Sequence, residues 1–237
     1  MASGITTIGF DADDTLWQNE RFFRLTEDRF QALLADHADP DHLAERLLAT
    51  ERRNLKLYGF GAKGFTLSMI ETALEVSDQR LPVAVIDEIL ALGRAMLSFP
   101  IETLPHVRET LDALAGRFRL VLITKGDLFD QERKLAQSGL GELFSGVEIV
   151  SDKTAATYAH VFAIHGDGAD RSLMVGNSLR SDILPALEAG AFAVHVPHEL
   201  TWAYERAVEA PDPDHPRLRT CDDIRGVLGF VDEIGAA

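Results

Sequence analysis

The sequence predicts an α/β protein with a buried parallel sheet and an all-helical insertion. After residue 104, short apolar runs alternate with stretches of helical periodicity, which indicates βαβ units. The apolar runs are nearly continuous, as in strands that are covered on both faces. A further apolar run at residues 5–10 precedes a block at 18–100 that has helical periodicity and no strand pattern. We therefore expect the first strand to join the later sheet, with the helices inserted after it.

Within the insertion, apolar side chains recur at spacings of three and four residues from Phe22 onward. Asp39 and Pro40 are a suitable N-cap and first residue for a second helix, which Gly59 can end. Two more helices are predicted at residues 66–76 and 83–97. The predicted domains are a core of residues 1–17 and 101–237 and a helical insertion of residues 18–100.

The core is predicted to alternate helices and strands from residue 105 onward. The predicted helices are 105–115, 128–138, 155–165 and 183–189. The predicted strands after 5–10 are 119–124, 147–150, 172–176 and 191–196. The patch at 210–216 is rich in proline, which breaks regular structure, and it is predicted to be linker-like.

Composition restricts the class of protein and its partners. A share of 46% hydrophobic residues is typical of a globular protein, and no apolar run is long enough to cross a bilayer. A formal charge of −15 argues against binding to nucleic acid or to an anionic membrane. A single cysteine and the absence of a signal-peptide pattern indicate the cytoplasm. An anionic substrate would need a local cation, so a metal ion is the first cofactor to expect.

Polar and charged side chains follow four of the predicted strands. Ligands of such sheets bind beyond the carboxyl ends of the strands, so these side chains are predicted to share one site. They are Asp11 and Asp13 after the first strand, Thr124 at the end of the second, Lys153 after the third, and Asn177 and Asp182 after the fourth.

The chemistry of this set fits the transfer of a phosphoryl group. Asp11 and Asp13 are two residues apart, so they point to the same side and repel each other unless a cation intervenes. Asp11 can attack phosphorus, while Asp13 protonates the leaving alkoxide and later deprotonates water. Mg²⁺ is the expected cofactor, with Asp11, Asp13, Asp182 and Asn177 as its predicted ligands. Lys153 and Thr124 would contact the nucleophile and the phosphoryl oxygens as further catalytic residues.

In these motifs the sequence resembles the haloacid dehalogenase-like superfamily over nearly its whole length. The motifs are DADDT at 11–15, the strand that ends in Thr124, Lys153, and GNSLRSD at 176–182. The resemblance implies a three-layer, Rossmann-like core in which the helical block is a C1 cap. Two positions depart from the family pattern. Asn177 stands where an aspartate is common, and Thr154 stands where many relatives have proline.

The resemblance also separates possible reactions. Dehalogenases of the family lack the second aspartate and need no metal, so Asp13 favours a phosphatase acting on a small phosphate monoester. A phosphomutase would keep both aspartates and is an alternative. So are a receiver-like domain and a non-catalytic phosphate-binding protein.

Three further side chains are candidate substrate contacts. Lys125 is adjacent to Thr124, whereas Arg53 and Lys63 lie in the insertion, near or within the glycine-punctuated, aromatic segment at 58–65. The expected partner is a small phosphorylated molecule. Both a monomer and a homodimer are compatible with the sequence.

Overall fold

The computed structural model describes residues 4–205, 211–212 and 214–236. The chain forms two compact units. An α/β unit comprises residues 1–18, 101–125 and 131–237, and a helical unit comprises residues 19–100 and 126–130. That the helical unit acts as a cap stays a prediction. Among the described residues, no helix combines the length and the apolar character needed to span a bilayer.

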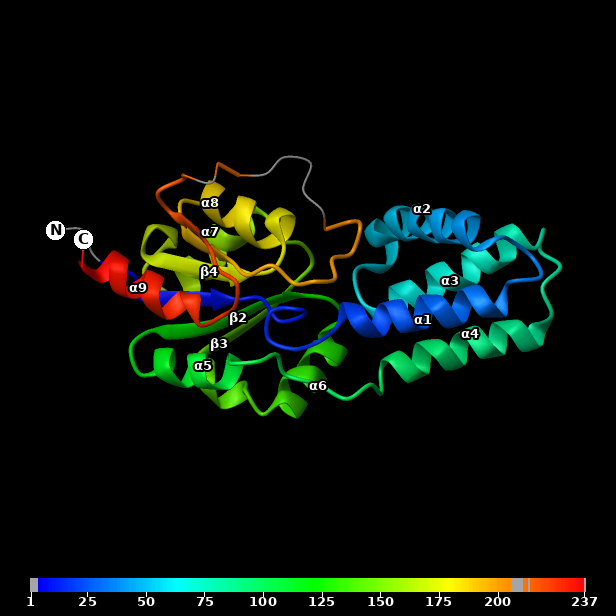
Figure 1. Ribbon diagram of the computed structural model, residues 1–237, viewed down its shortest axis with the longest axis horizontal. Helices are drawn as coiled ribbons and strands as arrows, with labels where there is room; N and C mark the ends of the chain where they lie inside the picture. Colours follow the sequence, from blue (N-terminus) through cyan, green and yellow to red (C-terminus); the bar gives the residue numbers. More distant parts are fainter. Residues whose placement is uncertain (1–3, 206–210, 213, 237) are drawn as a thin grey trace. The chain divides into compact units, whose positions relative to one another are not determined.

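The α/β unit contains a six-stranded sheet in which every pair of neighbouring strands is parallel. Its order is β3-β2-β1-β4-β5-β6, which places β1 inside the sheet between β2 and β4 (Figure 1). The strands are β1 Thr7–Phe10, β2 Arg119–Lys125, β3 Gly146–Val150, β4 Ser172–Gly176, β5 Phe192–His195 and β6 Leu218–Thr220.

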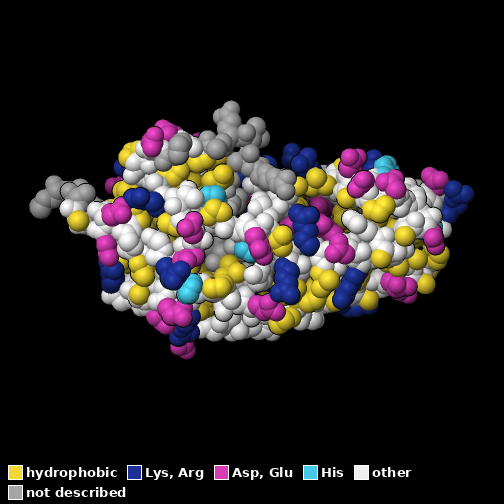
Figure 2. All heavy atoms as spheres, in the orientation of Figure 1, with side chains coloured by type: hydrophobic (Ala, Val, Ile, Leu, Met, Phe, Trp, Pro, Cys, Tyr) yellow, Lys and Arg dark blue, Asp and Glu magenta, His cyan; other side chains and the backbone are white. Residues whose placement is uncertain are grey.

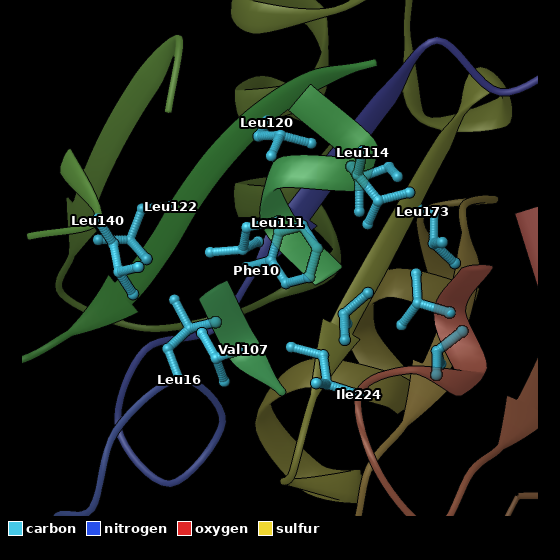
Figure 3. Packing of buried hydrophobic residues seen from close by; sticks show 14 of the residues in the cluster. Phe10, Leu16, Val107, Leu111, Leu114, Leu120, Leu122, Leu140, Leu173 and Ile224 are labelled. Carbon is cyan, nitrogen blue, oxygen red and sulfur yellow. The ribbon is translucent and has the colours of Figure 1, made fainter. Parts of the chain in front are cut away.

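Helices cover both faces of this sheet, so the unit has the three layers that the sequence predicts. They are α5 Val107–Ala115, α6 Leu128–Ser138, α7 Ala155–His165, α8 Leu184–Glu188 and α9 Gly226–Ala236. One face packs against α5 and α9 through a cluster that includes Phe10, Leu111 and Leu122 (Figure 3). The other face packs against α7 and α8, with Tyr158 and Phe162 among its buried residues.

The helical unit has an apolar core of its own, to which all four of its helices contribute. The helices are α1 Glu20–Leu33, α2 Pro40–Tyr58, α3 Ala62–Val76 and α4 Val83–Met96. Asp39 caps α2 by accepting a hydrogen bond from the His42 amide, as its N-cap position predicts. The rings of Phe22 and Phe99 stack with centroids 4.6 Å apart, which brings the two ends of the insertion together. Acidic and basic side chains are interspersed on the face of this unit that Figure 2 shows.

Three features of the α/β unit were not predicted from the sequence. Strand β6 has only three residues at the sheet edge, too few to give a periodic signal. Helix α9 contains three glycines, which lower helical propensity. The predicted helix at 183–189 is shorter, because a π-helical turn, η3 Leu179–Ile183, precedes α8. Of the predicted linker-like patch at 210–216, residues 210 and 213 lie outside the described residues.

Helices α3 and α4 approach closely at Gly93. A Cβ atom there would lie 2.2 Å from Thr66 Oγ1 and 2.7 Å from its Cγ2. Replacing glycine by alanine inside a helix ordinarily gains about 1 kcal/mol, but overpacking of this kind costs about 1–3 kcal/mol. We predict that Gly93→Ala lowers the free energy of unfolding, measured by urea denaturation. Gly229→Ala in α9, where a Cβ meets open space, is the matched control and should raise it by up to about 1 kcal/mol. Equal effects of the two substitutions would contradict this packing.

Candidate active site

The register of the sheet brings the predicted site residues to one edge. Phe10 pairs with Leu122 in β2 and with Val175 in β4, so Asp11 follows β1 where Gly176 ends β4. Lys153 follows β3, which pairs with β2 up to Lys125 and Val150. The carboxyl ends of these parallel strands therefore meet, although their residues are far apart in the sequence.

Lys153 lies between two carboxylates. Its Nζ is 2.5 Å from Asp11 Oδ1 and 2.7 Å from Asp182 Oδ1. All three side chains are buried, with Asp182 and Lys153 each 1% exposed. A buried charge is stable only when it is paired, and here two carboxylates share one ammonium, so Lys153 keeps a partner if either of them is neutralised.

The segment after β4 is folded around Asp182. Ser178 caps the π-helical turn by accepting from the Ser181 amide, and the Ser178 amide donates to Asp182 Oδ2 at 2.9 Å. Gly176 is needed because a Cβ at that position would lie 2.3 Å from Asp182 Oδ2. The hydroxyl of Tyr158 donates to the Ser181 carbonyl at 2.9 Å and lies 3.4 Å from Asp182 Oδ1. Asp182 is thus an anchor for Lys153 with both carboxylate oxygens engaged.

Thr154, which stands where many relatives have proline, directly precedes helix α7. Its hydroxyl accepts a hydrogen bond from the Thr157 amide and so caps α7. A hydroxyl at the N-cap supplies the helix start that a proline would otherwise favour. Lys153 is therefore held directly before a well-formed helix.

Thr15 joins Asp11 to Asn177. Its hydroxyl oxygen is 2.9 Å from Asp11 Oδ2 and 3.3 Å from Asn177 Oδ1. The same oxygen accepts a hydrogen bond from the backbone N–H of Asn177 at 3.1 Å. A carboxylate oxygen and a side-chain amide oxygen therefore both contact one hydroxyl. The sequence identified Asn177 but not the role of Thr15, although Thr15 belongs to the same acidic motif.

The electrostatics of the triad leave an excess of negative charge. Burial, together with the charges of Asp182 and Asp13 and against the opposing effect of Lys153, raises the pKa of Asp11 to about 7. Burial would lower the pKa of Lys153, but the two carboxylates outweigh it and raise this pKa. Burial, with Asp182 and Asp11, also raises the pKa of Tyr158 well above its usual value. One ammonium does not neutralise the surrounding carboxylates.

Asp13 has a separate set of partners. Lys134 Nζ lies 2.9 Å from its Oδ1 and 3.1 Å from its Oδ2. Gln131 Nε2 donates to Oδ2 at 2.9 Å, and the Trp17 indole N–H donates to Oδ1 at 2.7 Å. The sequence missed Gln131 and Lys134. A signal existed, because these two polar residues lie three apart on one side of a helix that directly follows β2.

Lys125 lies in a second polar cluster of the α/β unit. Its Nζ is 2.7 Å from Ser181 Oγ and 2.7 Å from Glu205 Oε1. Glu205 also accepts from Ser178 Oγ at 2.7 Å and from Ser181 Oγ at 2.5 Å. Burial would raise the pKa of Glu205, but Lys125 and the two serines lower it. Glu205, which the sequence did not indicate, thus pairs with the predicted substrate contact Lys125.

Thr124, Arg53 and Lys63 have partners of other kinds. The Thr124 side chain is buried, and its hydroxyl lies 3.3 Å from the Lys125 carbonyl. In the helical unit, Arg53 forms ion pairs with Glu71 and Glu75 (3.1 and 3.0 Å). Lys63 Nζ lies 2.9 Å from Asp127 Oδ1 in the same unit. The predicted substrate roles of Arg53, Lys63 and Lys125 and the predicted phosphate contact of Thr124 stay predictions.

The oxygen atoms at the end of β1 and β4 suit a hard cation. Mg²⁺ is usually bound by one or two carboxylates, with water and substrate phosphate completing its shell. Asp11 and Asn177 present such oxygens, and the excess negative charge at Asp11 favours a cation there. Asp13 and Asp182, also predicted as ligands, have their carboxylates engaged by other donors, as does Asp11, whose two oxygens contact Lys153 and Thr15. In the described part of the chain, no three His, Cys, Asp or Glu side chains form a group that could hold a metal.

Comparison with known proteins decides the family. A family model described as haloacid dehalogenase-like hydrolase matches residues 5–190. The chain belongs to the haloacid dehalogenase-like hydrolases. The resemblance predicted from four short motifs is thereby confirmed, as is the helical insertion after β1.

Several hydrolases resemble this haloacid dehalogenase-like hydrolase along its length. A solved haloacid dehalogenase-like family hydrolase from Xanthomonas campestris is 44% identical, with a TM-score of 0.88 and coverage of 98% of this chain and 93% of that one. The glyceraldehyde 3-phosphate phosphatase of Methanothermobacter thermautotrophicus is 26% identical over 93% of this chain and 96% of its own length. YfnB from Bacillus subtilis, a putative HAD-hydrolase solved with bound magnesium, shares the fold at 16% identity and a TM-score of 0.67, covering 97% of this chain and all of that one.

The raised pKa of Asp11 predicts a dependence of stability on pH. A carboxyl with a pKa near 7 when folded and 3.8 when unfolded destabilises the fold increasingly as the pH rises from about 4 to 7. We therefore expect Asp11→Asn, with a chelator at pH 8, to melt above the wild type. The gain should be about 2–4 °C for each kcal/mol regained, and it should shrink toward pH 4. Differential scanning calorimetry measures it.

The matched control is Asp36→Asn, which removes an exposed carboxylate from the helical unit. This variant should melt within a degree or so of the wild type at both pH values, because exposed substitutions change stability little. If Asp11→Asn melts at or below the wild type at pH 8, the Asp11 charge is already compensated in the metal-free protein.

Proposed function

We propose that this hydrolase is a Mg²⁺-dependent phosphatase that acts on a small phosphate monoester. The observation that carries the proposal is the separation of two neighbouring aspartates into different environments. Asp11 is buried against Lys153, whereas Asp13 is bound by Lys134, Gln131 and Trp17. Environments that differ so much allow two carboxyl groups to perform different steps of one reaction.

In the first step, a carboxylate oxygen of Asp11 attacks phosphorus and the bond to the leaving oxygen breaks. Asp13 gives its proton to that oxygen, and an aspartyl-phosphate forms on Asp11. In the second step, Asp13 takes a proton from water, whose oxygen attacks the same phosphorus. The bond between phosphorus and the Asp11 oxygen breaks, phosphate leaves, and both aspartates return to their starting states.

Lys153 and the metal provide the positive charge that this chemistry needs. Lys153 orients Asp11 through its 2.5 Å contact and offsets charge near the incoming phosphate. Asp182 fixes Lys153 in place. Mg²⁺, held by Asp11 and Asn177 with other oxygens, would neutralise phosphoryl oxygens and allow a dianion to approach the carboxylates.

The alternatives within the family differ at defined points. A dehalogenase has no use for a proton donor two residues after its nucleophile, so the elaborate binding of Asp13 favours phosphate esters. A phosphomutase would use the same residues and return the phosphoryl group to a sugar. Hydrolysis is supported by the similarity to a phosphatase, which at 26% identity suggests small sugar phosphates as the first substrates to assay.

The proposal predicts a metal-dependent phosphatase activity that requires Asp11. The wild type should release phosphate from 4-nitrophenyl phosphate and from at least one member of a panel of small sugar phosphates. Because Asn at position 11 cannot form the acyl phosphate, Asp11→Asn should lower kcat by at least about 10³-fold. Chelator should abolish turnover, and Mg²⁺ should restore it.

Asp41→Asn, which changes an exposed acid of the helical unit, is the control and should keep the wild-type rate. Turnover that persists in chelator or in Asp11→Asn would refute the mechanism. Transfer of phosphate to a sugar acceptor in preference to water would identify a mutase.

The residue at position 177 allows a separate prediction about the affinity for Mg²⁺. An aspartate there would replace a neutral amide oxygen with an anionic one beside Asp11, so Asn177→Asp should bind Mg²⁺ several-fold more tightly. The rise in melting temperature with Mg²⁺ concentration measures this without turnover. Asn177→Ala, which removes the oxygen, should shift the titration in the opposite direction. Identical titrations for all three proteins would exclude residue 177 from the metal site.

A further inference from the structure

The carboxylate of Asp13 accepts hydrogen bonds from three buried side chains. Trp17 is fully buried, and Gln131 and Lys134 are 3% and 9% exposed. The Asp13 side chain is 23% exposed. The donors therefore hold the carboxyl group while leaving part of it open to solvent, where a bound molecule can reach it.

We propose that Lys134 is a positioning residue that fixes Asp13 for proton transfer to the leaving group. Its Nζ contacts both oxygens, at 2.9 and 3.1 Å, so the plane of the carboxyl group cannot rotate freely. Trp17 and Gln131 each contact only one oxygen of the carboxyl group, Oδ1 and Oδ2 respectively. This inference rests on the proposed phosphatase function, in which Asp13 is the acid and base.

Gln131 supports the same arrangement. Its Nε2 donates to Asp13 Oδ2 at 2.9 Å and to the Lys125 carbonyl at 3.0 Å, which ties Asp13 to the last residue of β2. Its Oε1 is buried and has no hydrogen-bond partner among the residues that the structure describes. The amide is thus oriented by the two acceptors of its N–H groups, although its own acceptor stays unsatisfied.

If the Asp13 carboxyl group loses its fixed position, the rate of hydrolysis should fall for some substrates more than for others, according to their leaving groups. A sugar or glycerol alkoxide is strongly basic and must receive a proton as the bond to phosphorus breaks. A 4-nitrophenolate leaves without one. Displacement of a catalytic group by about 1 Å can cost about 10²-fold, but only in a step that uses the group. A variant that merely damages the fold would slow both substrates equally.

The experiment compares kcat/KM for 4-nitrophenyl phosphate with kcat/KM for an alkyl phosphate that the wild type hydrolyses. This ratio reports steps up to departure of the leaving group. Lys134→Met should lower the alkyl value at least about tenfold and the aryl value less than about threefold. Lys134→Arg, which keeps a two-oxygen donor, should recover most of the alkyl activity. Arg133→Met removes a charge from the preceding position of α6, where Arg133 donates to Gln137, and should alter neither value.

Equal losses on both substrates, or no loss on either, would overturn the positioning role. A crystal structure of Lys134→Met gives a readout that needs no turnover. The Asp13 carboxyl should leave the hydrogen bonds to Trp17 and Gln131, whereas an unmoved carboxyl overturns the proposal. A wild type that hydrolyses neither phosphate refutes the proposed function instead, and the crystal structure still decides whether Lys134 holds Asp13.

Discussion

The buried ammonium of Lys153 is the interaction on which the rest of the site depends. It contacts Asp11 after β1 and Asp182 after β4, while Lys153 itself follows β3. Since an unpaired charge in this position would cost several kcal/mol, the three segments constrain one another. The glycine at 176, the π-helical turn and the Thr154 cap all serve to bring these side chains within contact. Several local features of the α/β unit therefore position the side chains of one ion triad.

The two aspartates after β1 show how chain geometry can divide similar groups. Asp11 has a hydroxyl and a single ammonium that it shares with Asp182. Asp13 lies two residues further on and has a lysine of its own, together with an amide and an indole donor. The tight turn that follows, in which Asp14 has a φ of 61°, returns the chain so that Trp17 can reach Asp13. Two aspartates that are only two positions apart thus differ in exposure, because Asp11 is buried whereas the side chain of Asp13 is partly exposed.

The fold was predictable because its signals are local. Strand β4 at 172–176 and helices α6 and α7 have the predicted bounds, and Asp39 and Gly59 delimit α2 as expected. Strand β6 and helix α9 were missed because a three-residue edge strand and a glycine-containing helix carry little pattern. In the site, motif spacing indicated Asp11, Lys153 and Asp182, which the structure brings together. The partners of Asp13 and Lys125 depend on which side of α6 and which loop pack inward, and a single sequence does not encode that in any short motif.

Strand β1 depends on partners that are synthesised much later. Its neighbours β2 and β4 begin more than a hundred residues further along the chain, so β1 leaves the ribosome with both edges unpaired. At about 5–20 residues per second, this interval lasts several seconds or more. The insertion has its own apolar core, and the stacking of Phe22 on Phe99 returns the chain to where it departed. A folded insertion thereby replaces a long loop with a short one, which lowers the entropic cost of pairing β1 with β2. Besides any role at the site, the helical block is then a folding aid for the central strand.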